Sequence, residues 1–302
     1  MENNIFQNKI DAVEIHRHIS EKLSRAYGDH SVGIAHAWWL LETTLQTTRS
    51  SILLNKFILN DEQSTWLSHA VHRIVTENMP IQYIIGSVQF INLIIHVAPP
   101  ILIPRNETEA WVEQLITDYR TSLLTPHHIL DLCTGSGCIA IALAHTFPQA
   151  TIDAVDRDER AVALCQKNIQ INQLNNITTM LGNLFAPLPS HKKYDLIVAN
   201  PPYIPQAAYE KLDASVYRWE ASHALTAGED DIAIIKRIIQ EAPTWLYDNG
   251  RLIIEIDATQ GTRVMNLFHE HQFSDIHILR DYCHHDRVVT GIYRKKNHGT
   301  SS

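Results

Sequence analysis

The chain has 302 residues, of which 45% are hydrophobic and 19% are charged, and its formal net charge is −8. This composition supports a buried core, so it excludes a wholly disordered chain, and no apolar run reaches the roughly 18–20 residues of a membrane-spanning helix. The polar start Met1-Glu2-Asn3-Asn4 is unlike a secretory signal, so we expect a cytoplasmic two-domain protein without membrane contact, and the acid surplus argues against stable nucleic-acid binding.

Residues 1–78 carry apolar side chains at a helical spacing. Ile15, Ile19 and Leu23 recur every four residues, and a similar row includes Trp38, which we interpret as a core residue. The pattern predicts a first domain built as a bundle of about four helices.

Residues 79–104 do not continue this helical pattern. Gln82–Ile85 and Phe90–Val97 are rich in β-forming residues around Gly86. We predict that residues 79–104 form a β-hairpin that links two domains. A helix is expected next, at Asn106–Tyr119, because acidic residues in its first turn suit the helix dipole.

From Pro126 onward, short apolar strands alternate with helices. Strands are predicted at His128–Leu132, at Thr151–Val155 and at Asp195–Ala199, with further strands toward the end of the chain. Such alternation indicates a parallel sheet covered by helices on both faces, which is a Rossmann-like α/β fold. We assign this domain to residues 105–302.

A glycine turn follows the first of these strands, in the run Asp131-Leu132-Cys133-Thr134-Gly135-Ser136-Gly137. Gly135 and Gly137 let the backbone turn tightly and approach a ligand closely. Asp156 closes the second strand, where its carboxylate can accept both hydroxyls of a ribose. The pattern predicts a site for an adenosine-type cofactor, and Ala140 completes a G-x-G-x-x-A motif that keeps a dinucleotide such as NAD as an alternative.

The run Asn200-Pro201-Pro202-Tyr203 follows a later strand and should reach the same edge of the sheet. Amino groups attached to a carbonyl or an aromatic ring are poor nucleophiles, because their lone pair is delocalised. An enzyme that alkylates one must hold its two N–H bonds, and the Asn200 side-chain carbonyl and the Pro201 backbone carbonyl can accept them. The paired prolines keep the turn rigid, and Tyr203 can pack on the planar group.

Together these motifs resemble S-adenosylmethionine-dependent methyltransferases that act on planar amino groups. The segments Pro80–Gly86, Ile103–Glu109, Arg218–Glu220 and Arg280–Gly291 resemble, more narrowly, the peptide chain release factor glutamine methyltransferases (the HemK/PrmC family). That resemblance implies a seven-stranded class I methyltransferase sheet and an N-terminal helical domain that docks the release factor. It also implies methyl transfer from S-adenosyl-L-methionine to N5 of the glutamine in the factor's Gly-Gly-Gln motif.

The resemblance also implies roles for individual residues. Asn200 contacts both cofactor and substrate, and Pro201, Pro202 and Tyr203 complete the amide site. No metal is expected. The expected cofactor-binding residues are Asp131, Cys133, Thr134, Gly135, Ser136, Gly137, Asp156, Asn183, Leu184 and Asn200.

The chain departs from the family pattern in three places. Cys133 stands where the first glycine of the turn is usual, and Asn106 replaces a proline. Asn183 and Leu184 stand where an acid and often an aromatic residue flank the adenine. Cysteine keeps the turn if its φ is negative, and an amide still offers a donor and an acceptor to adenine. We therefore expect weaker cofactor binding rather than inactivity.

Other functions stay open. The sister family that methylates a glutamine of a large-subunit ribosomal protein shares the Cys-Thr-Gly-Ser-Gly form of the turn. Adenine-N6 methylation of nucleic acid shares the Asn-Pro-Pro-Tyr run but needs a basic groove and a target-recognition region. An inactive module that only docks a translation factor is a third alternative. Glu220 could shape the substrate pocket or form a structural ion pair, and Arg105 could pair with Glu109 or position the linker.

Cysteine and histidine do not indicate a metal site. Cys133 and Cys138 lack the second pair of a structural zinc site. The side chains of the neighbours Cys283-His284-His285-Asp286 point in different directions along the backbone. We expect the thiols to stay reduced.

Overall fold

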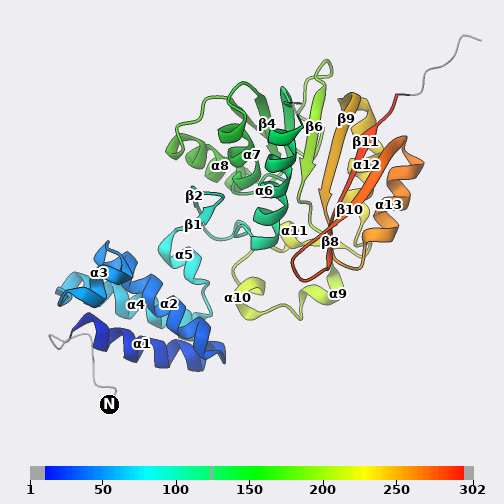
Figure 1. Cartoon of the computed structure of the whole chain (residues 1–302). Helices are drawn as coiled ribbons and strands as arrows, with labels where there is room; N and C mark the ends of the chain where they lie inside the picture. The colour runs from blue at the N-terminus through cyan, green and yellow to red at the C-terminus, as the bar shows by residue number, and fades with distance from the viewer. Residues whose placement is uncertain (1–10, 123–124, 296–302) are drawn as a thin grey trace, which may run out of the picture. The chain divides into compact units, whose positions relative to one another are not determined.

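The computed structural model describes residues 11–122 and 125–295 (Figure 1). Within them the chain forms two compact units. The first runs up to Gly86 and also takes in Ala214–Trp219, and the remaining described residues form the second. Among the helices of these described stretches, none is both long and apolar enough to cross a membrane.

The first unit is helical, which confirms the predicted N-terminal helices. Asp11, Asp29 and Thr48 accept hydrogen bonds from backbone N–H groups at the starts of its first three helices. Asn60 and Gln63 form a capping box at the start of the fourth. The helices are α1 Ala12–Tyr27, α2 His30–Leu45, α3 Arg49–Leu54, α4 Asp61–Glu77, α5 Ile81–Ile85 and α10 Ala214–Tyr217.

One apolar core joins α1, α2 and α4. The row Ile15, Ile19 and Leu23 is buried there, as its spacing predicts. Trp38 belongs to the same core, and its ring stacks on His16 with the ring centroids 3.8 Å apart. The first unit therefore has its own packed interior.

The segment Ala214–Trp219 is attached to α4. The indole N–H of Trp219 donates to the backbone carbonyl of Glu77 at 3.0 Å. The guanidinium of Arg73 lies 5.4 Å from the centroid of the same ring, within the range of a cation–π contact. This short insert therefore belongs to the first unit although it lies far along the chain.

The hairpin is shorter than predicted. The expected β-forming run at Gln82–Ile85 is wrong, because these residues lie in the short helix α5. Pro80 precedes that helix and Gly86 ends it at a φ of 83°, so the flanking residues favour a helical turn over the β preference of isoleucine. Ile81 packs into the core of the first unit, and Gly86 is the last residue of that unit before the hairpin. The hairpin consists of β1 Ser87–Phe90 and β2 Leu93–His96.

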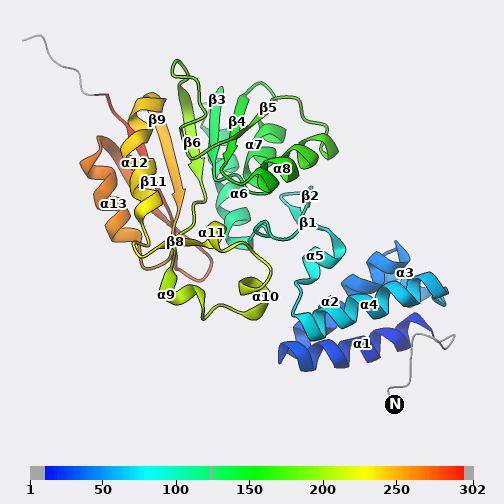
Figure 2. The same cartoon turned by 180° about the vertical axis from the view of Figure 1, so that it is seen from behind.

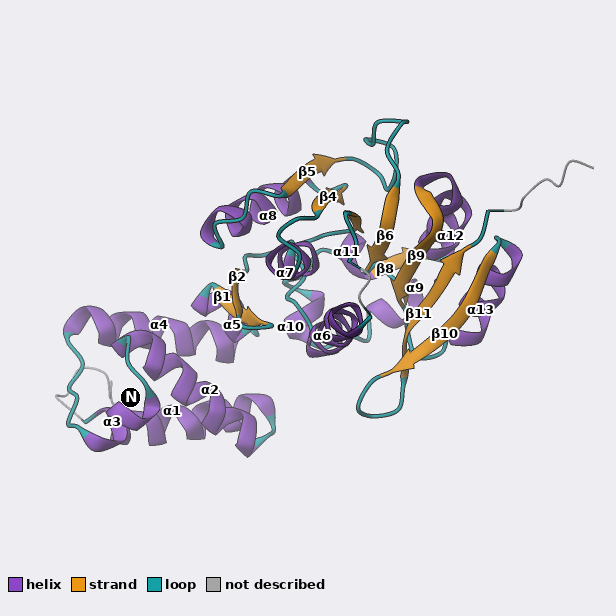
Figure 3. Ribbon diagram, turned by 45° about the horizontal axis from the view of Figure 1, so that its top comes forward, coloured by secondary structure: helices purple, strands orange, loops and turns teal. Residues whose placement is uncertain are grey.

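The second unit contains the predicted seven-stranded sheet (Figure 3). Its strands are β3 His128–Leu132, β4 Thr151–Asp156, β5 Ile177–Leu181, β6 Tyr194–Ala199, β9 Leu246–Glu255, β10 Phe273–Arg280 and β11 Asp286–Tyr293. Their order is β10-β11-β9-β6-β3-β4-β5, and β11 runs antiparallel to both of its neighbours. In the parallel part, Leu132 pairs with Val155 on one side and Ala199 on the other, so these strands end at one edge.

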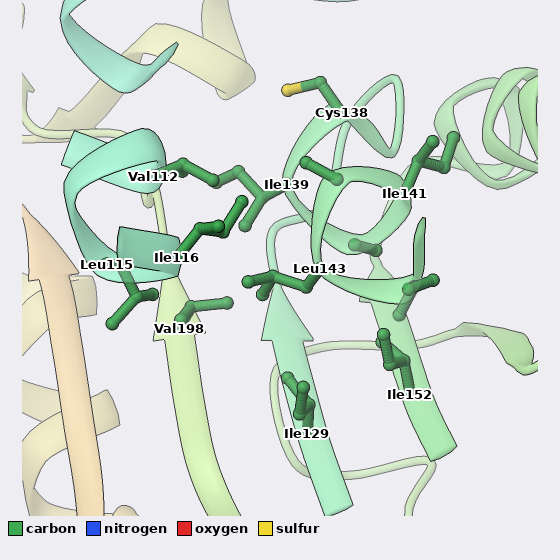
Figure 4. Close-up of a cluster of buried hydrophobic side chains, with 14 of the residues drawn as sticks. Val112, Leu115, Ile116, Ile129, Cys138, Ile139, Ile141, Leu143, Ile152 and Val198 are labelled. Carbon is green, nitrogen blue, oxygen red and sulfur yellow. The ribbon is translucent and has the colours of Figure 1, made fainter. Parts of the chain in front are cut away.

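Helices cover both faces of this sheet, as Figure 1 and Figure 2 show from opposite sides. They are α6 Asn106–Thr121, α7 Cys138–Thr146, α8 Glu159–Ile171, α12 Ala233–Trp245 and α13 Gly261–Glu270. The first three share a core in which Val112 lies beside Ile139 and to which Ile129 of β3 also belongs (Figure 4). The other two share a second core in which Ile235 packs with Leu130. Ile129 and Leu130 thus point to opposite faces, as neighbours in a strand must.

The segment between β6 and α12 leaves the sheet at its carboxyl edge. The N–H of Ala221 donates to the carbonyl of Pro100 at 2.8 Å, which fixes this segment to the chain that enters α6. Its elements in the second unit are β7 Ile204–Pro205, α9 Gln206–Tyr209, α11 Ser222–Leu225 and β8 Thr226–Gly228. The segment frames the pocket described next.

Candidate active site

A pocket opens at the carboxyl edge of the sheet. Its walls come from the turns after β3, β4, β5 and β6 and from the α11 region. The predicted site residues that line it are Cys133, Gly135, Asp156, Asn183, Leu184, Asn200 and Pro202. The glycine turn and the Asn-Pro-Pro-Tyr turn therefore face one cavity.

The other predicted site residues are not among those that line this pocket. Asp131 is fully buried, and its Oδ2 accepts a hydrogen bond of 2.6 Å from the Thr134 hydroxyl. Gly137 packs so closely on Cys165 that an added Cβ would lie 2.5 Å from the sulfur. The predicted residues that do not line the pocket are Asp131, Thr134, Ser136, Gly137, Pro201 and Tyr203. From this position Asp131, Thr134 and Gly137 can shape the glycine turn.

Cys133 adopts a left-handed backbone conformation with a φ of 60°. The condition under which we expected cysteine to keep the turn, a negative φ, is therefore not met. Gly135, two residues later, also has a positive φ. Cys133 therefore adopts a backbone conformation that glycine would adopt without strain. Such a conformation costs a residue with a Cβ about 1–2 kcal/mol. Burial raises the pKa of the Cys133 thiol, so it stays protonated and acts as a small apolar wall.

Asp156 ends β4 at the pocket. Its Oδ2 accepts from the backbone N–H of Gly135 and its Oδ1 from that of Asp158, both at 2.9 Å. Each carboxylate oxygen keeps a further lone pair, which can accept a hydroxyl of a ligand. Burial raises the pKa of this carboxyl above its ordinary value, and the two backbone hydrogen bonds oppose that rise.

Part of the pocket lining is apolar. Leu184 is buried and, at a φ of 54°, turns its side chain into the second core while lining the cavity. Ile101 and Ala161 add further apolar surface, and Asn183 adds an amide. A planar ring with polar edges fits such a wall, because apolar faces can cover it while the amide offers a donor and an acceptor.

Asn200 is held by a residue of α6. Its Nδ2 donates to the hydroxyl oxygen of Thr108 at 3.2 Å. The Thr108 hydroxyl in turn donates to Glu255 at 2.7 Å, and Glu255 is 2% exposed at the end of β9. With its amide nitrogen bound to Thr108, Asn200 keeps its carbonyl oxygen available as an acceptor.

Tyr203 is fixed at both its backbone and its hydroxyl. The hydroxyl donates to Oε1 of Glu255 at 3.3 Å, and the backbone carbonyl accepts from Nε2 of Gln260 at 3.1 Å. Gln260 is fully buried and its amide also donates to Oδ2 of Asp231 at 2.9 Å. The turn that carries Asn200 is therefore braced from α6, from β9 and from the start of α13.

Sequence reasoning missed Glu255, Thr108 and Gln260. The one visible signal was an acid at the end of an apolar predicted strand, since Glu255 follows Leu252-Ile253-Ile254. Thr108 lies in a segment already noted for its resemblance, but nothing in its neighbours predicts which side chain it meets. Gln260 carries no pattern that separates it from a surface glutamine.

Arg105 and Glu220 form an ion pair with each other. The Glu220 side chain is 1% exposed and also accepts from the N–H of Ile103 at 3.5 Å. Glu109, the other partner considered for Arg105, instead accepts from the N–H of Ile91 at 2.6 Å. The pair therefore joins the chain entering α6 to the segment that frames the pocket.

His223 closes the pocket on the side of Asp158. Its Nε2 lies 2.9 Å from Oδ2 of Asp158, and both residues line the cavity. Hydrogen bonds from Arg160, and then from the backbone and His223, lower the pKa of Asp158 to about 2. This carboxylate is therefore ionised at neutral pH and holds α11 against the turn after β4.

No metal centre is evident in the described parts of the chain, where no three His, Cys, Asp or Glu side chains gather as ligands. The four cysteines are free thiols. In the run that begins at Cys283, the N–H groups of Cys283 and His285 both donate to Asp281. That loop is organised by hydrogen bonds to a carboxylate.

Two family models match the chain in different places. The PrmC N-terminal domain matches residues 14–86, and the methyltransferase small domain matches residues 107–230. Together they cover the first unit and the part of the second unit that carries the glycine turn and Asn200.

Curated relatives match over most of their length. A release factor glutamine methyltransferase of Thermodesulfovibrio yellowstonii is 32% identical over 269 residues, which are 89% of this chain and 96% of that protein. A release factor glutamine methyltransferase of Thermosynechococcus vestitus is 39% identical over 255 residues, 82% of this chain and 84% of that protein. These alignments span both units.

Among solved structures, the 16S rRNA N2 G1207 methyltransferase of Thermus thermophilus, in complex with AdoMet and guanosine, matches with a TM-score of 0.54. The match covers 69% of this chain and 50% of that protein at 17% identity, which shows a shared fold. The second unit therefore has the class I methyltransferase fold.

Proposed function

The chain belongs to the release factor glutamine methyltransferase family, and we propose that it transfers a methyl group from S-adenosylmethionine to N5 of a glutamine in a peptide chain release factor. The acceptor is the glutamine of the factor's Gly-Gly-Gln motif. The observation that carries the proposal is the position of Asn200, which lines the same pocket as Asp156 and the glycine turn.

The pocket offers groups that suit each part of the cofactor. Asp156 has free lone pairs for the two ribose hydroxyls, and Leu184 with Asn183 can cover and hydrogen-bond the adenine. The turn from Cys133 to Gly137 can bring its backbone close to the methionine portion. When bound, S-adenosylmethionine supplies an electrophilic methyl group at a sulfonium centre.

The chemistry needs acceptors for the amide of the substrate. Asn200 Oδ1 and the backbone carbonyl of Pro201 accept the two N–H bonds of the glutamine amide in our proposal. Holding both hydrogens aims the nitrogen lone pair at the methyl carbon, so the rate gain comes from positioning and from preorganised acceptors. The extra proton leaves after the transfer, because the alkylated nitrogen is then acidic.

The substrate assignment is tested by mass spectrometry. Purified release factor, ribosomal proteins and adenine-containing DNA are each incubated with the protein and S-adenosylmethionine, and the products are mapped for one added methyl group. We expect the methyl group on the Gly-Gly-Gln glutamine of the release factor. A methyl group found only on a ribosomal protein glutamine or on adenine would replace this proposal with the corresponding alternative.

The role of Asn200 is tested in the same assay. Asn200→Ala should lower the turnover by about 100-fold or more, because it removes an acceptor that acts on the reacting nitrogen. Binding of S-adenosylhomocysteine, followed by calorimetry, reports whether the pocket survives the substitution. Turnover near that of the wild type would contradict the assigned role.

We further propose that the first unit docks the release factor, since its residues 14–86 match the PrmC N-terminal domain. Release factors act on ribosomes, so the cytoplasm is the proposed site of action. From the sequence we propose domains at residues 1–78, 79–104 and 105–302. The docking role belongs to the first of these domains in our proposal.

A further inference from the structure

A buried hydrogen-bond network lies directly behind Asn200. Ala199 and Ile254 are register partners in β6 and β9, so Asn200 and Glu255 follow at equivalent positions on adjacent strands. The Thr108 hydroxyl lies between them, 3.2 Å from Asn200 Nδ2 and 2.7 Å from Glu255 Oε2. Thr108 and Glu255 are each 2% exposed, so water does not compete for these bonds.

The donors and acceptors in this network fix one another. The Thr108 hydroxyl donates to Oε2 of Glu255 at 2.7 Å, so its single proton points at Glu255. The Thr108 oxygen is then an acceptor toward Asn200. Because this oxygen accepts at 3.2 Å, the NH₂ group of the Asn200 side chain must face Thr108. The Asn200 carbonyl oxygen then faces away from Thr108.

The opposite orientation of Asn200 is disfavoured. It would place the Asn200 carbonyl against Thr108, and the hydroxyl would have to turn its proton away from Glu255. Two oxygens without a proton between them would then face each other at 2.7 Å in a buried site. The polarity of the network therefore selects one of the two amide orientations.

We propose that Thr108 and Glu255 are positioning residues that hold the Asn200 carbonyl oxygen toward the substrate amide. The inference rests on the proposed function for the identity of that amide, and on the network itself for the orientation. A flipped Asn200 would present an NH₂ group to the N–H bonds of the glutamine, where an acceptor is needed. Thr108 and Glu255 act through Asn200 and do not touch the reacting atoms.

Glu255 is held as an acceptor by the groups around it. Besides Thr108, the indole N–H of Trp111 donates to its Oε2 at 2.7 Å and the Tyr203 hydroxyl to its Oε1 at 3.3 Å. Burial raises the pKa of Glu255 above its ordinary value, and these three hydrogen bonds and the positive charge of Arg287 oppose that rise only in part. Because indole nitrogen can only donate, Trp111 also fixes an acceptor at the Oε2 position.

The test removes the Thr108 hydroxyl without changing the shape of the site. Thr108→Val keeps the volume and loses the hydrogen bonds, and Thr108→Ser keeps the hydroxyl as the matched control. We expect Thr108→Val to lower kcat about tenfold or more, with the KM for S-adenosylmethionine within about twofold of the wild type. Thr108→Ser should restore kcat. Thr108→Ala replaces the valine variant if the latter does not fold.

Glu255→Gln is the second variant that tests the proposal. Trp111 requires the amide oxygen of the new glutamine at the Oε2 position, so the Thr108 bond survives and only the partner of Tyr203 changes. This variant should therefore retain more turnover than Thr108→Val. A larger loss than in Thr108→Val would overturn the proposal, as would wild-type kcat in a folded Thr108→Val protein.

A readout without substrate separates this proposal from the proposed function. The side-chain NH₂ signal of Asn200, identified as the ¹⁵N signal missing from Asn200→Ala, should exchange its hydrogens slowly in the wild type and faster in Thr108→Val. If the wild type leaves the release factor unmethylated, the proposed function fails and this signal still decides the orientation. Equal exchange in both proteins would overturn the positioning role.

Discussion

The backbone N–H of Gly135 donates a hydrogen bond of 2.9 Å to the carboxylate of Asp156. This bond joins the glycine turn after β3 to the acid that ends β4. The other oxygen of the same carboxylate accepts from the N–H of Asp158, which fixes the next turn as well. The polar side of the pocket is therefore held in place by hydrogen bonds within the protein, and preorganisation of this kind reduces the ordering cost of binding.

The positive φ of Cys133 predicts that Cys133→Gly stabilises the protein. Glycine adopts this conformation freely but loses more backbone entropy on folding, so we expect a net gain of about 1 kcal/mol. That gain corresponds to a rise in Tm of about 2–4 °C for a domain of this size. Cys133→Ala is the matched control, because it removes the thiol and keeps the Cβ. An equal rise in both variants would show that backbone strain is not the cause.

Alanine substitutions at the two glycines of the turn should affect different properties of the protein. An added Cβ at Gly137 would lie 2.5 Å from the sulfur of Cys165, so Gly137→Ala should lower the Tm strongly. An added Cβ at Gly135 has nothing within 4 Å, so Gly135→Ala should cost about 1 kcal/mol through its φ and mainly weaken S-adenosylhomocysteine binding, because Gly135 lines the pocket. Thermal denaturation and calorimetry measure the two effects. The assignment fails if the two variants show the same pattern.

Asp131 predicts a pH dependence of stability. Burial raises its pKa from 3.8 to about 7, although the Thr134 hydroxyl lowers it in part. The folded state therefore binds this proton more tightly than the unfolded chain, and the contribution of Asp131 to stability falls as the pH rises from about 4 to about 7, by up to about 1.4 kcal/mol per pH unit. Asp131→Asn should reduce the difference in Tm measured between about pH 5 and about pH 7. An unchanged difference would contradict the prediction.

Removing Arg105 should destabilise the protein more than removing its ion-pair partner Glu220. The Glu220 side chain is 1% exposed and that of Arg105 is 34% exposed, so only the arginine can be solvated when its partner is lost. Arg105→Gln should cost about 3–5 kcal/mol, because it leaves a buried carboxylate unpaired, and Glu220→Gln should cost less. The double variant should recover part of the loss. Denaturation of all four proteins checks the order, and equal costs for the two single variants would refute it.

Much of the second unit could be predicted from its apolar runs. Strands buried on both faces need continuous apolar residues, and His128–Leu132 and Asp195–Ala199 show them clearly. Because the carboxyl ends of parallel strands share an edge, the same reasoning brought the glycine turn and Asn200 to one pocket. The roles of the individual site residues remain predictions.

The rest depended on contacts that local sequence does not encode. Thr108 and Glu255 are separated by 147 positions, and their hydrogen bond exists because α6 packs beside the end of β9. The φ of Cys133 is set by the path of the turn and not by the preference of cysteine. At Gln82–Ile85, burial of Ile81 and the flanking Pro80 outweighed the β preference of isoleucine.

The attachment of Trp219 to α4 bears on how this chain could be recombined with its relatives. Ala214–Trp219 counts with the first unit, while the residues on either side of it count with the second. Deleting the N-terminal helices would remove both contacts of the Trp219 indole, the hydrogen bond to the Glu77 carbonyl and the cation–π contact with Arg73. A chimera that swaps these helices must therefore carry the matching Ala214–Trp219 segment with them, although that segment lies far along the chain within the second unit's sequence.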